Sequence, residues 1–166
     1  MRERKAYQLI RESYGTRTTE RSKVPLINHI DEGLIVLNEL NANTATLDAY
    51  CLHPLVQHDH DLKTNYQIIS QNIDAFTVLL AMEYRSVANE HLSRSNPETE
   101  IRLSPLHEVT QMLIADKVQN RKDFDLYHKG THPRSQELEQ YFARWLTRLN
   151  VSEEFYQHLC LLITRK

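Results

Sequence analysis

Apolar side chains recur at helical spacing along most of the chain, most clearly in the segment from Leu106 to Tyr127. At about 100° per residue, as a helix requires, one arc holds its large apolar side chains: Leu106, Val109, Met112, Leu113, Phe124 and Tyr127. Asp116 and Asn120 fall in the middle of the same arc. Because an unsatisfied buried polar group costs roughly 1–3 kcal/mol, both must be hydrogen-bonded, ion-paired or bound to a metal. The pattern predicts a helix that directs a carboxylate and an amide inward, toward an internal hydrogen-bond network or a chemical site.

The remaining apolar repeats predict further helices on both sides of this central one. Ser104 is expected to cap the central helix with Pro105 at its first position, and the segment that starts at Gly130 ends it. Pro54 is expected to kink or end the helix that begins near Thr44. Residues 95–100 form a predicted turn. The other predicted helices cover residues 2–13, 28–40 with Asn28 as cap, 64–93 in one piece or broken near Ala81, 135–149 and 152–163.

The composition favours helices over strands. The chain has only three glycines and five prolines, and patterns that alternate with the period of a strand are nearly absent. Its 166 residues are enough to bury one proper core. We therefore expect a single all-α domain over residues 1–166, with about six to eight helices and with the helices that hold His53 and Asp116 at its centre.

Charge and hydropathy exclude several classes of partner. The 20 basic and 22 acidic residues give a net charge of −2, so no overall field attracts a nucleic acid. No apolar run approaches the roughly 18 residues of a membrane span, and no signal peptide is visible. Cys51 and Cys160 stand alone in apolar surroundings, which predicts buried free thiols in a reducing compartment. We expect a soluble cytoplasmic protein that binds neither nucleic acid nor membranes and that could form homo-oligomers.

Histidine is abundant, with nine residues in the chain and five of them from His29 to His91. His29 lies at the edge of an apolar arc, and His53 lies in a segment with almost no polar face. A helical bundle could bring both imidazoles together with the Asp116 carboxylate around one divalent ion. Each histidine could instead be a hydrogen-bonded core residue, because three dispersed residues form a weak motif.

Two polar segments are further candidates for chemistry. In residues 57–61, four of the five side chains could bind a metal; the alternative is an exposed loop and helix start with Asp61 as the cap. Residues 16–23 contain no apolar side chain and include Arg17, Arg21 and Lys23. This second segment is either a solvated loop or a phosphate clamp.

Three stretches resemble a known family. Asn28-His29, the run from Ala49 to His53, and the run from Leu113 to Arg121 are similar to the metal-site segments of the HD superfamily, above all the hydrolase domain of the RelA/SpoT alarmone enzymes and their small relatives. The resemblance covers roughly residues 6–128, with C-terminal helices over 134–164 expected to pack on that part. It implies a helical domain that binds manganese and removes pyrophosphate from the 3′ position of (p)ppGpp. It also implies these roles: His29, His53 and Asp116 as metal ligands, Asn120 in contact with substrate, and Arg17 near the nucleotide.

The chain departs from the family pattern directly after His53. Pro54 replaces the family's aspartate, and Gln57-His58 replace its Glu-Asp pair. The loss of carboxylates disfavours Mn²⁺ and favours Zn, Fe, Co or Ni. A register slip of five residues would make His58-Asp59 the His-Asp pair.

Two functions therefore stay open. One is a metal-dependent phosphohydrolase of a nucleotide or other phosphorylated small molecule, with His58 or Asp59 as base and Arg17 with Lys23 on the phosphate. The other is a catalytically inactive module that binds a nucleotide or a protein and needs no metal.

Overall fold

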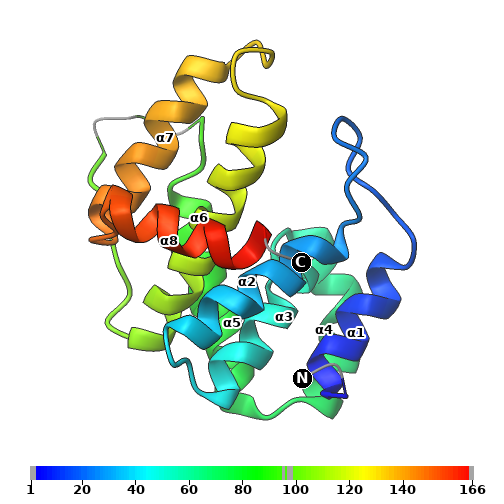
Figure 1. Ribbon diagram of the computed structural model, residues 1–166. Helices are drawn as coiled ribbons and strands as arrows, with labels where there is room; N and C mark the ends of the chain where they lie inside the picture. The colour runs from blue at the N-terminus through cyan, green and yellow to red at the C-terminus, as the bar shows by residue number, and fades with distance from the viewer. Residues whose placement is uncertain (1–2, 95, 97–98, 165–166) are drawn as a thin grey trace.

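The computed structural model describes residues 3–94, 96 and 99–164, and within them every regular element is an α-helix (Figure 1). An isolated antiparallel bridge joins Thr18 to Pro25 in the loop between the first two helices. The prediction of an all-α fold with six to eight helices is confirmed for this part of the chain. The helices are α1 (Lys5–Tyr14), α2 (Ile27–Glu39), α3 (Thr44–Val56), α4 (Asp59–Asn72), α5 (Ala75–Glu90), α6 (His107–Tyr127), α7 (Ser135–Arg148) and α8 (Glu153–Thr164).

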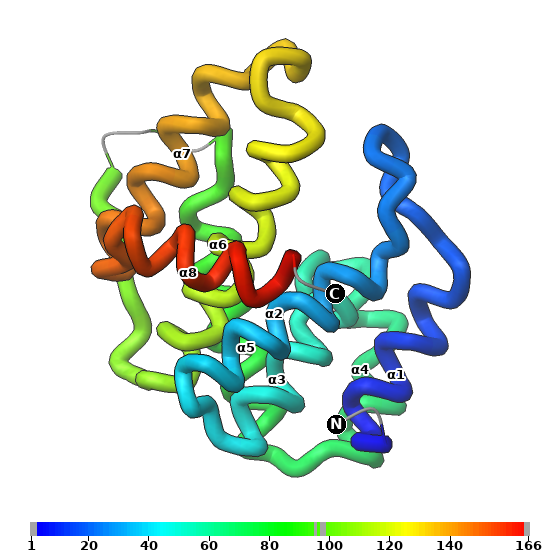
Figure 2. The backbone as a smooth tube through the Cα atoms, viewed as in Figure 1, coloured from blue at the N-terminus to red at the C-terminus, as the bar shows by residue number. Residues whose placement is uncertain are grey.

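Helices α3 and α6 occupy the centre, as the apolar patterns predicted. Helix α3 packs against α1, α2, α4, α5 and α6, and α6 packs against α2, α3, α5, α7 and α8. In Figure 2, α7 lies beside the C-terminal part of α6, and α8 crosses α6 and contacts α2. Because every other helix contacts α3 or α6, side chains on these two helices can meet in the interior.

A glycine allows α2 and α3 to approach closely. A Cβ atom on Gly33 of α2 would lie 2.1 Å from the hydroxyl oxygen of Tyr50 on α3, far inside contact distance. Tyr50 is completely buried at this helix crossing. The bare backbone at Gly33 therefore gives the tyrosine ring its space, and it brings the helices that hold His29 and His53 together.

Two helix boundaries differ from the predicted ones, the break before α5 and the start of α2. Both alternatives for residues 64–93, one helix or a break near Ala81, are wrong. The chain breaks at Ile73 and Asp74, where Asp74 Oδ1 accepts a hydrogen bond from the Thr77 backbone N–H at 3.0 Å. Asn28 does not cap α2; it lies inside that helix, which begins at Ile27 without a side-chain cap. A side-chain cap therefore marks the start of α5 but not that of α2, and the apolar repeat alone predicted neither boundary.

Two further starts differ in the same way. Helix α6 begins at His107 because the Ser104 hydroxyl accepts from the Leu106 N–H, which leaves Ser104 and Pro105 outside the helix. Helix α4 begins at Asp59, so Asp61 lies in its first turn and not at the cap. Ser95, Pro97 and Glu98 of the predicted turn lie outside the described residues.

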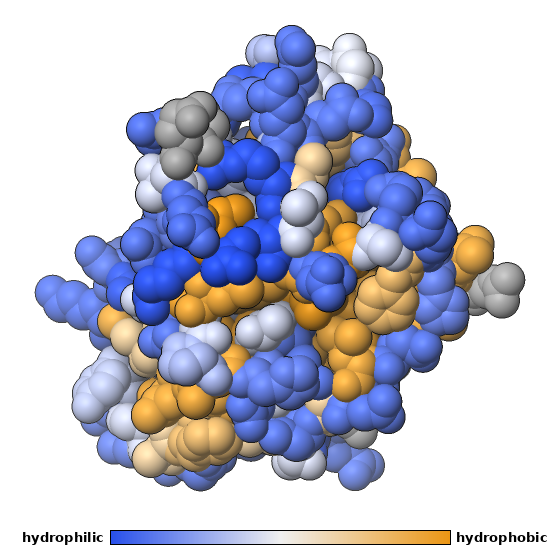
Figure 3. Space-filling view, turned by 90° about the vertical axis from the view of Figure 1, so that its left-hand side faces the viewer, coloured by the Kyte–Doolittle hydropathy of each residue, from blue (hydrophilic) through white to orange (hydrophobic). Residues whose placement is uncertain are grey.

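No helix in the described part of the chain is long and apolar enough to cross a membrane. On the face drawn in Figure 3, hydrophobic side chains form separate patches between hydrophilic ones. Cys51 is buried as predicted, but Cys160 is only half-buried, because its side of α8 is partly open to solvent.

Candidate metal centre

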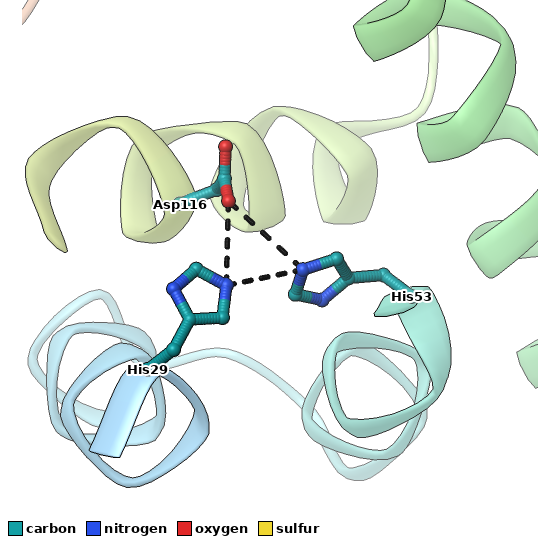
Figure 4. Close-up of side chains that lie close together, drawn as sticks. All are labelled: His29, His53 and Asp116. Carbon is teal, nitrogen blue, oxygen red and sulfur yellow. Dashed lines mark hydrogen bonds and ion pairs between the residues drawn. The ribbon is translucent and has the colours of Figure 1, made fainter. Parts of the chain in front are cut away.

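Three side chains from three central helices converge in the interior (Figure 4). His29 of α2 and His53 of α3 bring their Nε2 atoms to 3.2 Å from one another. Asp116 Oδ1 of α6 lies 3.5 Å from His29 Nε2 and 3.9 Å from His53 Nε2. His53 and Asp116 are buried, and His29 is half-buried. The convergence predicted from the three apolar faces is confirmed.

The proton on the His53 ring is fixed by the main chain. His53 Nδ1 lies 2.6 Å from the carbonyl oxygen of Tyr50, and a carbonyl oxygen can only accept. The Nδ1 atom therefore carries the proton, and Nε2 of the neutral ring presents a lone pair to the cluster. Burial, with a further contribution from His29, lowers the pKa of His53 to about 3, so the neutral ring is the stable form at neutral pH.

Pro54 makes this carbonyl available. In a regular helix the Tyr50 carbonyl would accept from the N–H of the residue four positions later, which is Pro54, and proline has no N–H. The proline ring also pushes away the carbonyl four residues before it, which tilts that group out of the helix. The proline beside a buried histidine thus has a local physical reason: it frees the acceptor that orients the imidazole.

The His29 ring is fixed by a side chain of α6. His29 Nδ1 lies 2.6 Å from Gln119 Oε1. The Gln119 amide nitrogen donates to the carboxylates of Glu32 at 3.1 Å and Asp123 at 2.8 Å, so the amide oxygen must be the atom that faces the histidine. Nδ1 of His29 is therefore the donor, and the neutral ring turns its Nε2 lone pair toward His53.

The two histidines and Asp116 thus form a cluster of electron-rich atoms that a positive charge would stabilise. Two imidazole lone pairs and a carboxylate oxygen face one another with no hydrogen between them in the neutral rings. Either a proton on one Nε2 or a metal cation resolves the repulsion. Two imidazoles whose Nδ1 atoms bond to oxygen acceptors, with one carboxylate beside them, form a donor set that fits a divalent transition metal.

The second oxygen of Asp116 is held by a buried lysine. Lys117 Nζ lies 2.8 Å from Asp116 Oδ2, and the ammonium stands 4.9 Å from the centre of the Trp145 ring. Asn120 donates to Asp116 Oδ1 at 2.9 Å. Burial alone would raise the pKa of Asp116, but Lys117 and both imidazoles outweigh it and lower the pKa below its usual value. Burial would likewise lower the pKa of Lys117, but the carboxylate raises it. Asp116 is therefore ionised and its Oδ1 faces the histidines.

The cluster lies in a cleft of about 550 Å³ that contains some of the predicted residues and not others. Arg17, His58 and Asn120 line this cleft. Lys23 does not; it lies in the loop before α2, with φ of 59°. Asp59 does not line it either, because its almost fully exposed carboxylate pairs with Arg85 on α5. The structure therefore places Lys23 and Asp59 outside this cleft, and their roles as phosphate ligand and base stay predictions.

The residues after His53 are engaged in packing. Gln57 donates to the side chain of Asn89 on α5, and Asn89 donates back to the Gln57 carbonyl at 2.9 Å. His58 lies outside the cluster that His53 joins, so the geometry contradicts the register slip that would pair His58 with Asp59.

The sequence patterns missed several polar residues of the site. Asp61, expected either as one of four possible metal binders in residues 57–61 or as a helix cap, lines the cleft without joining the cluster. Tyr84 also lines it, with its ring 4.9 Å from that of His53. Gln119 and Lys117 are buried, although lysine and glutamine are usually assigned to solvent. In the sequence, only their positions linked these two residues to the site: Lys117 directly follows Asp116, and Gln119 lies three residues after it.

Comparison with protein-family models, with curated proteins and with solved structures gave no match. The HD resemblance therefore rests on the three quoted stretches alone.

Proposed function

We propose that the protein binds one divalent metal ion through His29 Nε2, His53 Nε2 and Asp116 Oδ1, and that it hydrolyses a phosphate ester or anhydride of a nucleotide or similar small molecule in the cleft. One observation carries the proposal. Both imidazoles are held with Nδ1 on an oxygen acceptor, so their lone pairs meet 3.2 Å apart beside a carboxylate. Without a cation, this arrangement is electrostatically unfavourable.

The chain's own residues set the character of the site. A bound divalent ion would supply Lewis-acid chemistry, polarising a phosphoryl oxygen and acidifying water. Lys117 keeps Asp116 ionised and engages its Oδ2, which leaves Oδ1 for the ion. Two nitrogen donors and a single carboxylate favour Zn, Fe, Co or Ni over Mn. Three protein ligands also match catalytic zinc sites, which keep further positions open.

Arg17 and Asn120 are the proposed contacts to substrate. Arg17 lies at the cleft with Nη2 donating to the Ser13 carbonyl at 2.7 Å and its guanidinium above the Tyr14 ring. These contacts hold the side chain and leave Nη1 without an acceptor among the described residues. A phosphate oxygen is the natural acceptor for that group. The cleft volume of about 550 Å³ falls within the range of small-molecule sites.

The proposed base is His58 or Asp61. Both line the cleft, His58 directly before α4 and Asp61 in its first turn. An imidazole or a carboxylate can accept a proton from a nucleophilic water. Their place on a helix end outside the buried cluster leaves them free to approach a substrate.

One observation favours a second candidate, an inactive binding module. Pro54 and Gln57 leave no carboxylate directly after His53, and Gln57 is engaged with Asn89. Such a protein would bind a nucleotide through Arg17 and Asn120 without cleaving it.

Metal analysis of protein purified without chelator tests the proposal. We expect close to one equivalent of a transition metal in the wild type, a loss of metal in His29→Ala, His53→Ala and Asp116→Ala, and no loss in His107→Ala, which removes an exposed imidazole outside the cleft. Wild-type protein that stays metal-free after incubation with Zn²⁺, Co²⁺, Ni²⁺, Fe²⁺ and Mn²⁺ would reject the metal centre.

Turnover decides between the two candidates. With metal present, a nucleotide panel that includes (p)ppGpp should release phosphate or pyrophosphate, and His58→Ala or Asp61→Asn should lower the rate at least about a hundredfold, as expected for loss of a general base. Metal-loaded protein that binds a nucleotide through Arg17 and Asn120 but cleaves none would establish the binding module.

A further inference from the structure

A second cleft, of about 580 Å³, opens beside the metal cleft. Its lining residues come from the loop after α1, the segment after α5, the C-terminal part of α6 and α7. Thr19, Leu92, Asn120 and Asp123 line both clefts, so the two adjoin. Its far wall is α7, which lies outside the part of the chain that carries the family resemblance.

The charge in this second cleft is predominantly positive. Arg21 from the loop after α1 and Arg94 from the segment after α5 line it from two sides. Neither guanidinium has a hydrogen bond or salt bridge to a described residue. The hydrogen bond from Arg134 is the main cause of the lowered pKa of Glu137, and the positive charge of Arg94 adds to it. The one acidic residue of the lining, Asp123, shares the Lys122 ammonium with Glu32: Lys122 Nζ lies 2.7 Å from Asp123 Oδ1 and 2.7 Å from Glu32 Oε2.

Two histidines add hydrogen-bond capacity to the same cleft. His132 Nδ1 accepts from the Arg134 backbone N–H at 3.0 Å, so in the neutral ring the proton is on Nε2, which is a donor. The His128 ring lies 6.3 Å from that of His132. Arg21 lines the same cleft, and burial together with the positive charge of Arg21 lowers the pKa of His132.

Aromatic side chains complete the lining. Tyr141 of α7 is half-buried, and the buried Phe124 and Phe142 also line the cleft with their rings 5.6 Å apart. Guanidinium groups that share a cleft with aromatic rings suit a ligand that combines an anion with a flat ring.

From these contacts we infer that the second cleft is a binding site for an aromatic anion of the nucleoside phosphate class, held by Arg21, Arg94 and His132 and packed on the Tyr141 ring. The site uses no residue of the metal cluster. It therefore binds its ligand whether or not a metal is present.

Titration calorimetry on protein stripped of metal tests this site separately from the metal centre. The probes are sodium pyrophosphate, adenosine 5′-diphosphate and adenosine. We expect pyrophosphate to bind, the nucleotide to bind more tightly because its base adds a stacking contact, and adenosine to bind too weakly to detect. The double variant Arg21→Glu/Arg94→Glu should weaken both anions at least about tenfold. Lys5→Glu/Arg11→Glu is the matched control, because it makes the same change in charge at exposed positions of α1 and should change neither affinity.

Imidazole NMR signals locate the ligand on the unmodified protein. Pyrophosphate should shift the resonances of His128 and His132 and leave that of His158, on α8, unchanged. His53→Ala, which destroys the metal cluster, should keep its pyrophosphate affinity. The inference is overturned if metal-free protein binds no pyrophosphate, if both double variants weaken it equally, or if the His132 resonance does not move. A nucleotide that binds no better than pyrophosphate would refute the aromatic part of the site.

Discussion

Replacing Pro54 with alanine is expected to stabilise the metal-free protein and at the same time weaken its metal binding. Alanine restores a backbone N–H four residues after Tyr50, so the Tyr50 carbonyl regains its helical donor. That donor competes with His53 Nδ1, which now lies 2.6 Å from the same oxygen. The imidazole then loses part of the contact that fixes its proton and its orientation.

The two effects have opposite signs and can be estimated separately. Inside a helix, proline is about 3 kcal/mol less favourable than alanine, and removing its restriction of the unfolded chain offsets up to about 1 kcal/mol. Pro54 lies close to the end of α3 at Val56, so we expect a net gain of about 1–2 kcal/mol. Loss of a contact that orients a histidine ligand typically weakens metal binding about 10–100-fold. A carbonyl has a second lone pair, so the lower end, about tenfold, is expected.

Urea unfolding of metal-free protein measures the first quantity, and competition for Zn²⁺ with a chromophoric chelator measures the second. Pro133→Ala is the control, because Pro133 is exposed in the loop before α7 and lines neither cleft. It should leave the metal affinity unchanged. The reasoning about Pro54 fails if Pro54→Ala binds Zn²⁺ as tightly as the wild type, or if stability and affinity fall together.

Three further predictions concern the helices around the cluster. Gly33→Ala should destabilise the protein by about 1–3 kcal/mol in urea unfolding, because the new Cβ would overlap the Tyr50 ring, although helix propensity alone predicts a gain in stability. In a Tyr50→Leu background this loss of stability should disappear. An equal loss there would contradict the overlap. Lys117→Met should lower the free energy of unfolding of the metal-free protein by about 3–5 kcal/mol, because it leaves Asp116 without its cation. Added Zn²⁺ should stabilise the variant more than it stabilises the wild type. An equal gain in both proteins would mean that the ion and the lysine do not share the carboxylate. The stability of metal-free protein should fall as the pH drops from about 6.5 toward 3, because burial lowers the pKa of His53 to about 3 in the folded protein while the unfolded chain takes up its proton near 6.5. In urea unfolding measured across this range, His53→Asn should reduce the dependence of stability on pH. An unchanged dependence would assign the effect to other groups.

The sequence predicted the central helices and the cluster because both depend on local patterns. Asp116 stands out in the sequence as a polar interruption of an apolar stripe, and His53 as the polar residue of a nearly all-apolar segment. Side chains on apolar faces must point to the shared interior, so their convergence follows from helix geometry. The break between α4 and α5 was missed, although Asp74 with Thr77 forms an ordinary N-cap, because the apolar positions run across it without a visible change of period.

The group that orients His29 could not be predicted, because it is distant in sequence, 90 residues along the chain. Gln119 is buried by contacts to His29 and to Glu32, which is 87 residues away. Helix α6 is buried on most of its circumference, so glutamine and lysine side chains lie inside where a one-sided amphipathic pattern would place them in solvent. Only the tertiary arrangement shows which of these polar side chains are paired.

Pro54 indicates a lost metal site when only the sequence is considered, and a supported one when the structure is considered. Next to His53, a proline in place of the family's aspartate indicates a lost metal ligand and thus a lost activity. In the structure, the same proline frees the Tyr50 carbonyl that fixes the His53 tautomer, so it supports a ligand set of two imidazoles and one carboxylate. Three protein ligands with an open position are the usual arrangement of a catalytic zinc ion, and a fourth carboxylate is not required. The absent aspartate therefore weighs less against hydrolysis than its position in the motif indicates, and the rate dependence on His58 and Asp61 becomes the deciding measurement.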